Sequence, residues 1–313
     1  MGCRGKHRAL FYEDPGDFVD AVGAFACDGL GAGDHVLAAL TGQKRRWIEE
    51  ELGDEADAIE FLDAGPLYER HGVMFRQMLG SLAHHEQPDQ QRLRVVAEQA
   101  LALREPADAR DYMRYEAAAN VLYDRYDVAV LCPFDASRLP EELLEAALET
   151  HPEVLDAGTT RRNERFVDPR AFLRRRAQIP GAPADVAPQR IERAEDIAVL
   201  RAIVAAQGRA AGLNRLAVEE LALAVSEVVT NALVHGRAPR HVWTYVADGR
   251  FVCRLEDGGS GLRDPLAGYF PPDPRSLGGR GLWLARQLCD VVEIASDAEG
   301  TIVALQVRLP RRD

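Results

Sequence analysis

A carboxylate and an amide stand four residues apart in the chain, at Glu227 and Asn231. Apolar residues recur around them at the spacing of an amphipathic helix, which predicts a helix over Leu216–His235. Side chains four apart on a helix are neighbours, so these two polar groups would lie together. On a helix that is otherwise apolar at that depth they need a polar partner. The alternative is a helix edge half in solvent.

An apolar strand predicted over Phe251–Leu255 runs into a second chemically suggestive segment. Asp257 can accept a hydrogen bond, for instance from the amino group of a base. Gly259 and Gly261 allow the backbone to approach a ligand closely and to adopt positive φ. Taken alone, the pattern is also typical of a hairpin or loop.

A second group of glycines, in the segment LGGRGL at residues 277–282, precedes a helix predicted over Leu282–Leu288. Glycines directly before a helix expose its first backbone amides, which form a ready site for phosphate. Further on, Gly300 and Thr301 precede a terminal strand predicted over Ile302–Leu309.

The ordered set of these four motifs resembles the nucleotide site of the GHKL ATPase superfamily. In length and spacing it is most similar to the anti-sigma-factor serine kinase family, and the resemblance covers residues 190–313. It implies a Bergerat-type α/β sandwich, with a mixed sheet and helices on one face. The chain contains no GxxxxGK[ST] sequence, so it is not a P-loop protein.

The resemblance implies ATP and Mg²⁺ as cofactors. Asn231 would coordinate Mg²⁺, and Glu227 would be the catalytic base that takes a proton from a serine hydroxyl attacking the γ-phosphate. Asp257 would bind the adenine amino group, supported by Thr301. The other residues implied to bind ATP lie in the glycine segments: Gly259, Gly261, Gly279, Arg280 and Gly281.

The first half of the chain alternates short apolar runs with helical patterns, which favours a mostly parallel sheet covered by helices. A helix is predicted over Phe18–Cys27, ended by the glycines of residues 29–33, and another over Trp47–Leu52. Strands are predicted over His7–Tyr12, His35–Leu40, Ile59–Leu62, Leu93–Ala97 and Val128–Cys132.

The segments HRALFYED (7–14), LCPFD (131–135) and THPEV (150–154) resemble the MEDS sensory module, named after methanogen and methylotroph regulators. The resemblance covers residues 5–157. It implies an α/β fold related to RecA-like ATPases but without a usable P-loop, and a role in sensing a small molecule.

Ligands of parallel sheets bind outside the carboxyl ends of the strands. This rule directs attention to a set of polar residues at those ends: Glu13, Asp14, Thr41, Glu98 and Asp135.

Other polar residues of the first half stand apart from these strand ends. Glu116 and Asn120 are four apart on a predicted helix. His7, Cys132 and His151 suggest a metal, but they lack the spacing of known ligand motifs. Buried residues that are hydrogen-bonded or simply packed are therefore the favoured interpretation of these three.

The boundaries expected are a sensory domain at residues 1–160, an Arg- and Pro-rich linker at 161–189 and an ATP-binding domain at 190–313. The arginines of the linker would form either a patch for nucleic acid or an acidic partner, or a solvated helix face, which is favoured. They are Arg161, Arg162, Arg165, Arg170, Arg174, Arg175 and Arg176.

Composition limits the function classes. The 313 residues carry a net charge of -12, which argues against non-specific binding of duplex DNA. No apolar run approaches the ~20 residues of a membrane helix, and the first residues do not form a secretory signal. The five cysteines have no CxxC spacing, so a reduced cytoplasmic setting is expected.

The function expected is that of a cytoplasmic, signal-responsive regulator. It would bind Mg-ATP and phosphorylate a serine of a STAS-type anti-anti-sigma protein, sequester a sigma factor, or both. The family also implies homodimerisation. The alternatives are a non-catalytic, ATP-dependent binding module and a sensor kinase that lacks its phosphoacceptor histidine. Histidine-kinase chemistry is disfavoured because no histidine occurs between Ile179 and Leu216.

Overall fold

The computed structural model describes residues 6–98, 100–101, 105–175, 177, 179, 181–273 and 279–310. The chain divides into two compact units. The first unit contains the residues up to Phe172, apart from Arg70–Val73. The second unit contains Arg70–Val73 and the residues from Leu173 onward. None of the helices in these ranges combines the length and apolar character needed to span a membrane.

The first unit is built on a seven-stranded sheet with the order β3-β2-β4-β5-β1-β6-β7. All neighbouring strands pair in parallel except β7, which is antiparallel to β6. Every strand predicted in this half is present. The strands are β1 (Lys6–Tyr12), β2 (His35–Leu40), β3 (Glu60–Asp63), β4 (Leu93–Ala97), β5 (Val128–Asp135), β6 (Glu153–Asp156) and β7 (Thr159–Arg162).

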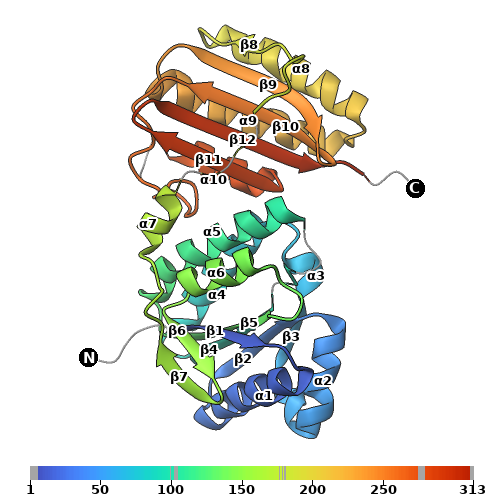
Figure 1. The fold of residues 1–313 in the computed structure, drawn as a ribbon, viewed down its shortest axis with the longest axis vertical. Coiled ribbons are helices and arrows are strands. Elements are labelled where there is room, and N and C mark those ends of the chain that lie inside the picture. Colours follow the sequence, from blue (N-terminus) through green and yellow to red (C-terminus); the bar gives the residue numbers. More distant parts are fainter. Residues whose placement is uncertain are drawn as a thin grey trace. The chain divides into compact units, whose positions relative to one another are not determined.

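Helices cover both faces of this sheet, with α1 and α2 on one side and α4, α5 and α6 on the other (Figure 1). On the first side, Leu10, Val36 and Leu131 of the sheet share a buried core with Phe18 and Val22 of α1. The helices are α1 (Pro15–Ala32), α2 (Gly42–Leu52), the 3₁₀ helix η1 (Gly53–Ala58), α3 (Ala64–Leu67), α4 (His71–His85), α5 (Pro106–Tyr123) and α6 (Glu141–Thr150).

Helix α1 is longer than predicted. It begins after Asp14, whose side chain accepts a hydrogen bond from the backbone N–H of Gly16. It continues through Gly29, which is buried against Arg94, and ends only at Gly33, where φ is 77°. The helix therefore ends within the predicted stop segment, residues 29–33, but at the last glycine of that segment.

A single solvated helix face was expected for the arginine-rich run, and the structure does not show one. Arg161 and Arg162 lie in the exposed edge strand β7, and Arg170 and Arg174 lie in α7 (Pro169–Arg174). Arg161 forms an ion pair with Asp156 within its own hairpin. Arg176 lies outside the described residues.

The second unit contains a five-stranded sheet with the order β11-β12-β10-β9-β8. Each neighbouring pair is antiparallel, so the mixed sheet expected for this unit was wrong. Its elements are β8 (Gln189–Arg190), α8 (Glu195–Ala211), α9 (Arg215–His235), β9 (Arg240–Ala247), β10 (Arg250–Asp257), α10 (Arg280–Leu288), β11 (Val291–Asp297) and β12 (Gly300–Arg308).

The two faces of this sheet are covered differently. One face shares a core with α8, α9 and α10, in which Val204, Val225 and Ala285 are buried with strand residues such as Phe251 and Leu305. The opposite face is covered by the proline-rich segment: Ile179, Ala182 and Val186 pack against Tyr245, Val252 and Ala304. Three helices on one face of a sheet confirm the α/β sandwich expected for this unit, beside the mostly parallel sheet of the first.

Candidate functional site

Helix α9 carries the first two candidate residues of the second unit. Asn214 caps it by accepting a hydrogen bond from Ala217 N–H at 2.9 Å. Its buried stripe faces the core, which leaves Glu227 and Asn231 half-buried at the side of the helix. Within the described ranges, neither side chain has a hydrogen-bond or ion-pair partner, so both are available to a ligand.

Asn231 lies against the first turn of α10. A Cβ atom added at Gly281 would stand 2.7 Å from Asn231 Nδ2, closer than packed atoms tolerate. Gly279, the N-cap of α10, has a φ of 83°, and Arg280 begins the helix with its side chain exposed. The glycines thus bring the amide of Asn231 next to the first backbone N–H groups of α10, which have no acceptor within the helix itself.

Asp257 ends strand β10 and is the cross-strand partner of Thr301 on β12. Its Oδ1 accepts a hydrogen bond from Gly259 N–H at 2.8 Å. No described residue hydrogen-bonds its Oδ2. Thr301 Oγ1 lies 3.2 Å from Ser296 Oγ on β11, so the hydroxyls of two neighbouring strands meet beside the aspartate.

Glycines occupy the positions around Asp257, where a side chain would collide with the aspartate or with neighbouring backbone. A Cβ added at Gly236, the residue that ends α9, would lie 2.7 Å from Asp257 Oδ1. The same atom is 2.7 Å from a Cβ added at Gly259. Gly261 has a φ of 77° and is packed on the backbone of Asp297. These contacts place Asp257 near the C-terminal end of α9, the same end that carries Asn231.

The geometry fits a magnesium nucleotide. An amide oxygen without a described partner suits a hard cation, the opened turn of α10 suits phosphate, and a carboxylate at the sheet edge suits an amino group. Glu227 lies one helical turn before Asn231, where a proton acceptor would be beside the metal ligand.

The first unit contains a cavity of about 340 Å³ between the sheet and helices α4 and α5. Its walls are mostly apolar, with contributions from Leu37, Val95 and Val130 of the sheet and from Phe75 and Ala119 of the helices. Glu116 and Cys132 form part of the same wall. A pocket of this size and character suits a small apolar molecule.

The polar residues at the carboxyl ends of the strands do not line this cavity. Glu98 accepts hydrogen bonds from Thr41 N–H at 2.8 Å and Thr41 Oγ1 at 2.9 Å, and Lys44 Nζ lies 2.7 Å from its other oxygen. Asp135 accepts hydrogen bonds from Ser137. Glu98 thus joins the ends of β4 and β2, and Asp135 closes its own turn. The cavity lies on a face of the sheet, away from these strand ends.

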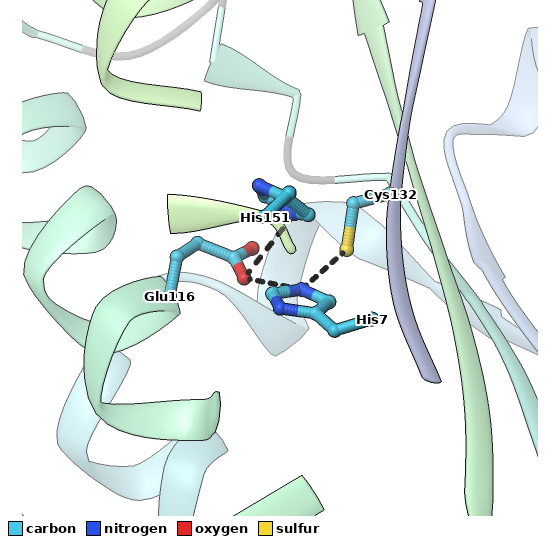
Figure 2. Close-up of side chains that lie close together, drawn as sticks. All are labelled: His7, Glu116, Cys132 and His151. Atoms are coloured by element: carbon cyan, nitrogen blue, oxygen red, sulfur yellow. Dashed lines mark hydrogen bonds and ion pairs between the residues drawn. The ribbon is translucent and has the colours of Figure 1, made fainter. Parts of the chain in front are cut away.

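Next to the cavity, four buried side chains meet: His7, Glu116, Cys132 and His151 (Figure 2). The sheet order explains their meeting. His7 lies on β1, Cys132 on the neighbouring β5, and His151 directly before β6, the strand on the other side of β1. Sequence reasoning named each of them but did not join the histidines and the cysteine to Glu116, because strand order is not visible in local spacing.

Burial controls the protonation of this cluster. Desolvation, and secondarily the charge of His7, lowers the pKa of His151 to about 3, so its imidazole is neutral at physiological pH. Burial acts to raise the pKa of Glu116, but hydrogen bonding and attraction from His7 outweigh it and lower that pKa, so the carboxylate is ionised. Burial and the Glu116 charge raise the pKa of Tyr112, which keeps its hydroxyl as a donor to Glu116.

Two protein-family models match the chain, and each falls mainly in one of the two compact units. Residues 6–152 match the model of the MEDS family, the methanogen/methylotroph, DcmR sensory domain. Residues 192–307 match the model of the histidine kinase-like ATPase domain. A search of curated proteins found no match.

Solved structures match over part of the chain. The RsbU and RsbW domains of a Mycobacterium tuberculosis protein are 24% identical over 40% of this chain and 33% of theirs, with a TM-score of 0.30. The histidine kinase domain of a blue-light-activated kinase from Erythrobacter litoralis EL346 is 20% identical over 44% and 74%, with a TM-score of 0.25. The histidine kinase domain of the E. coli osmosensor EnvZ is 16% identical over 43% and 94%, with a TM-score of 0.25.

The chain spans about a third of the length of the RsbU and RsbW structure that it matches. The family models show what each part resembles, and the second of them implies ATP as the ligand of residues 192–307. The chain therefore resembles a MEDS sensory domain over residues 6–152 and a histidine kinase-like ATPase domain over residues 192–307.

Proposed function

We propose that the protein is a signal-responsive regulator of the anti-sigma type. Its C-terminal domain, residues 190–313, binds Mg-ATP and transfers the γ-phosphoryl group to a serine of a STAS-type anti-anti-sigma protein. The observation that carries this proposal is the position of Asn231, which has no described hydrogen-bond partner and lies against the first turn of α10 at Gly281.

The residues divide the work as follows. Asn231 holds Mg²⁺ at the phosphates, and the first N–H groups of α10 after Gly279 and Arg280 receive phosphate oxygens. Asp257 accepts a hydrogen bond from the adenine amino group through Oδ2, beside Thr301. Gly259 and Gly261 have no side chains, so the backbone of their loop can approach the adenine ring closely. ATP supplies the transferable phosphoryl group.

Glu227 acts as the base of the transfer. The serine Oγ of the partner forms a bond to the γ-phosphorus, while the bond from that phosphorus to the bridging oxygen breaks and ADP leaves. The hydroxyl proton passes to the Glu227 carboxylate. Its place one turn before Asn231 supports this role, because the attacking oxygen must approach the same phosphorus that the metal polarises.

The sensory domain, residues 1–160, would change the rate of phosphoryl transfer when it binds its signal. Its apolar cavity supports a small, mainly apolar molecule as the signal, and the segment 161–189 joins the two domains. A sigma factor would be the second partner, held when the serine protein is phosphorylated. Homodimerisation through the C-terminal domain is part of the same proposal.

The test uses the full-length chain. Proteins captured from a host lysate with and without ATP are identified, and purified candidates are given labelled ATP in a single-turnover reaction. Transfer of label to a serine of a captured protein supports the proposal. ATP-dependent capture without any transfer would replace it with the non-catalytic binding module. Label on a histidine of a captured protein would replace it with a sensor kinase that lacks its own phosphoacceptor.

A further inference from the structure

We propose that His7, Glu116, Cys132 and His151 form a binding site for a zinc-type divalent metal ion in the sensory domain. One ligand atom from each of the four residues lies within 4.8 Å of the others (Figure 2). This site lies in the first unit and is independent of the nucleotide site.

The distances between the donor atoms match those around a small metal ion. His7 Nε2 lies 3.1 Å from Glu116 Oε2 and 3.4 Å from Cys132 Sγ. His151 Nε2 lies 3.8 Å from Glu116 Oε2. Bond lengths to zinc of about 2.0–2.3 Å place tetrahedral ligands roughly 3.3–3.7 Å apart. A single ion therefore fits among the four atoms with small adjustments of the side chains.

The tautomer of His7 is fixed by Asn120. The amide nitrogen of Asn120 donates to the backbone carbonyls of Glu116, Ala117 and Thr150, at distances of 3.1, 3.4 and 2.8 Å. Its Oδ1 therefore faces His7 and accepts a hydrogen bond from Nδ1 at 3.0 Å. With a proton held on Nδ1, Nε2 is the nitrogen that faces the cluster and the one that binds a metal ion when the ion displaces its proton.

The tautomer of His151 is fixed in the same way. Its Nδ1 lies 2.8 Å from the carbonyl oxygen of Ala147, which accepts a hydrogen bond and leaves the lone pair on Nε2. That Nε2 is buried and has no hydrogen-bond partner among the described residues. Outer hydrogen bonds of this kind, to an amide or a carbonyl, are how proteins orient metal-binding histidines.

The cluster thus needs a cation. Glu116 is ionised beside two imidazoles and away from water, and a positive charge among them stabilises this arrangement. That charge is either a proton on His7 Nε2, which then pairs with Glu116, or a metal ion that displaces the proton. A divalent ion would also balance two negative charges, those of the Glu116 carboxylate and of a Cys132 thiolate. A cysteine and two histidines with one carboxylate select a metal of intermediate softness, for which zinc is the ordinary choice.

The cavity supplies a route to the site. Glu116 and Cys132 line both the cavity and the cluster, so a metal ion held there would form part of the cavity wall. Tyr112 fixes the other carboxylate oxygen of Glu116 by donating its hydroxyl proton. A metal ion entering from the cavity would therefore meet a carboxylate that is already oriented.

A different function for the same residues is a reactive thiol. The arrangement resembles a nucleophilic cysteine site, because the thiol of Cys132 contacts Nε2 of His7 and Nδ1 of the same ring is held by Asn120 Oδ1. The metal site is favoured because Glu116 also faces Nε2, and because His151 contributes a fourth donor that such a nucleophile does not use.

The test measures metal binding by the full-length protein directly. Protein treated with a chelator and dialysed is titrated with Co²⁺, a spectroscopic substitute for zinc. We expect one equivalent to bind, with visible bands of a tetrahedral ion and a near-ultraviolet thiolate-to-cobalt band that Zn²⁺ abolishes. The thiolate band itself reports cysteine ligation in the unmodified chain.

Variants assign the ligands. Cys132→Ser should remove the thiolate band, while Cys27→Ser, which changes the half-exposed thiol of α1, should retain it. His151→Gln should weaken Co²⁺ binding at least about tenfold. The fluorescence of Trp47, which lies in the first unit, reports in a Trp243→Phe, Trp283→Phe background that this unit is folded in each variant.

Two results would overturn the proposal. One is wild-type protein that binds ATP but shows no thiolate-to-cobalt band, and the other is a band that persists in Cys132→Ser. Rapid alkylation of Cys132 by iodoacetamide, without any Co²⁺ binding, would establish the reactive thiol in its place.

Discussion

Gly281 faces the side-chain amide of Asn231 so closely that a Cβ atom at position 281 would lie 2.7 Å from Nδ2. Gly281→Ala should therefore force the amide to turn away. The fold should tolerate the change because the displaced group is the end of a side chain. We expect ATP affinity in the presence of Mg²⁺ to fall about tenfold, or ~1.4 kcal/mol, measured by calorimetry on the full-length chain.

Gly31→Ala provides the matched control, since that glycine also lies in a helix and a Cβ there would meet nothing within 4 Å. It should leave ATP affinity unchanged. Equal affinity of the Gly281→Ala variant and the wild type would show that the Asn231 amide is not a ligand of the metal nucleotide.

Glu227→Gln keeps the size of the side chain and removes its basic oxygen. Phosphoryl transfer to the partner serine should fall about 10²–10⁴-fold, the usual contribution of a general base, while ATP affinity stays the same. Asn231→Ala should reduce both affinity and transfer. Glu219→Gln, on the exposed side of the same helix, serves as the control and should affect neither. Transfer at the wild-type rate by Glu227→Gln would remove Glu227 from the mechanism.

Asp257→Asn should weaken ATP binding by about 1–3 kcal/mol. The new Oδ1 still accepts from Gly259 N–H, but Nδ2 replaces the oxygen that would meet the adenine amino group. Affinity for GTP, which lacks that amino group, should fall less than affinity for ATP. Asp248→Asn is the control, because Asp248 lies in the β9–β10 turn with a φ of 48° that asparagine tolerates. A uniform loss for both nucleotides would indicate a structural role.

Two neighbouring alanines of α5 distinguish the cavity from the packed core. Ala119 lines the cavity, whereas Ala118 is fully buried and does not line it. Ala119→Leu should keep or raise thermal stability and abolish the stabilisation that benzene, used as a small apolar probe, gives the wild type. Ala118→Leu should destabilise by about 1–3 kcal/mol through overpacking. Equal destabilisation by both changes would contradict an open cavity.

Cys253 and Cys289 should make the second unit sensitive to alkaline pH. Burial raises the pKa of both thiols well above their ordinary range. The unfolded chain ionises above about 8.5 while the folded chain keeps its protons, so stability is complete below that pH and falls above it. The loss should approach ~1.4 kcal/mol per pH unit for each thiol.

Urea unfolding between about pH 8 and 10 measures this slope. In a Trp47→Phe background, Trp243 and Trp283 report on the second unit alone. Cys253→Ala should make the pH slope shallower by about 1.4 kcal/mol per unit. An unchanged slope, or rapid labelling of Cys253 in the native protein, would contradict its burial.

Periodicity and turn residues predicted most individual elements. Strands β2 and β4 match their predicted bounds, and α9 differs from its prediction by one residue. These elements have buried faces that repeat at the helix or strand period, so local pattern is sufficient. The motifs at Asn231 and Asp257 were likewise visible because each lies within a short segment.

Relations between distant segments were not predictable in this way. The interpretation of His7, Cys132 and His151 rested on ligand spacing along the chain, whereas their proximity comes from β1 lying between β5 and β6. The cavity was missed for a similar reason, because Leu37, Ala119 and Val130 form it only once α5 packs on the sheet. Local sequence patterns do not contain strand order or the space that side chains leave between layers.

Because β1 lies in the middle of its sheet, an ion bound at the four-residue cluster would link distant parts of the chain. His7 and Cys132 are 125 positions apart, so an ion bound to both would close a loop comprising most of the domain. By the chain-entropy argument used for covalent cross-links, such a closure disfavours the unfolded chain by roughly 5 kcal/mol. Loss of the ion would remove this constraint on the unfolded chain, so the domain's resistance to unfolding would report whether the ion is present.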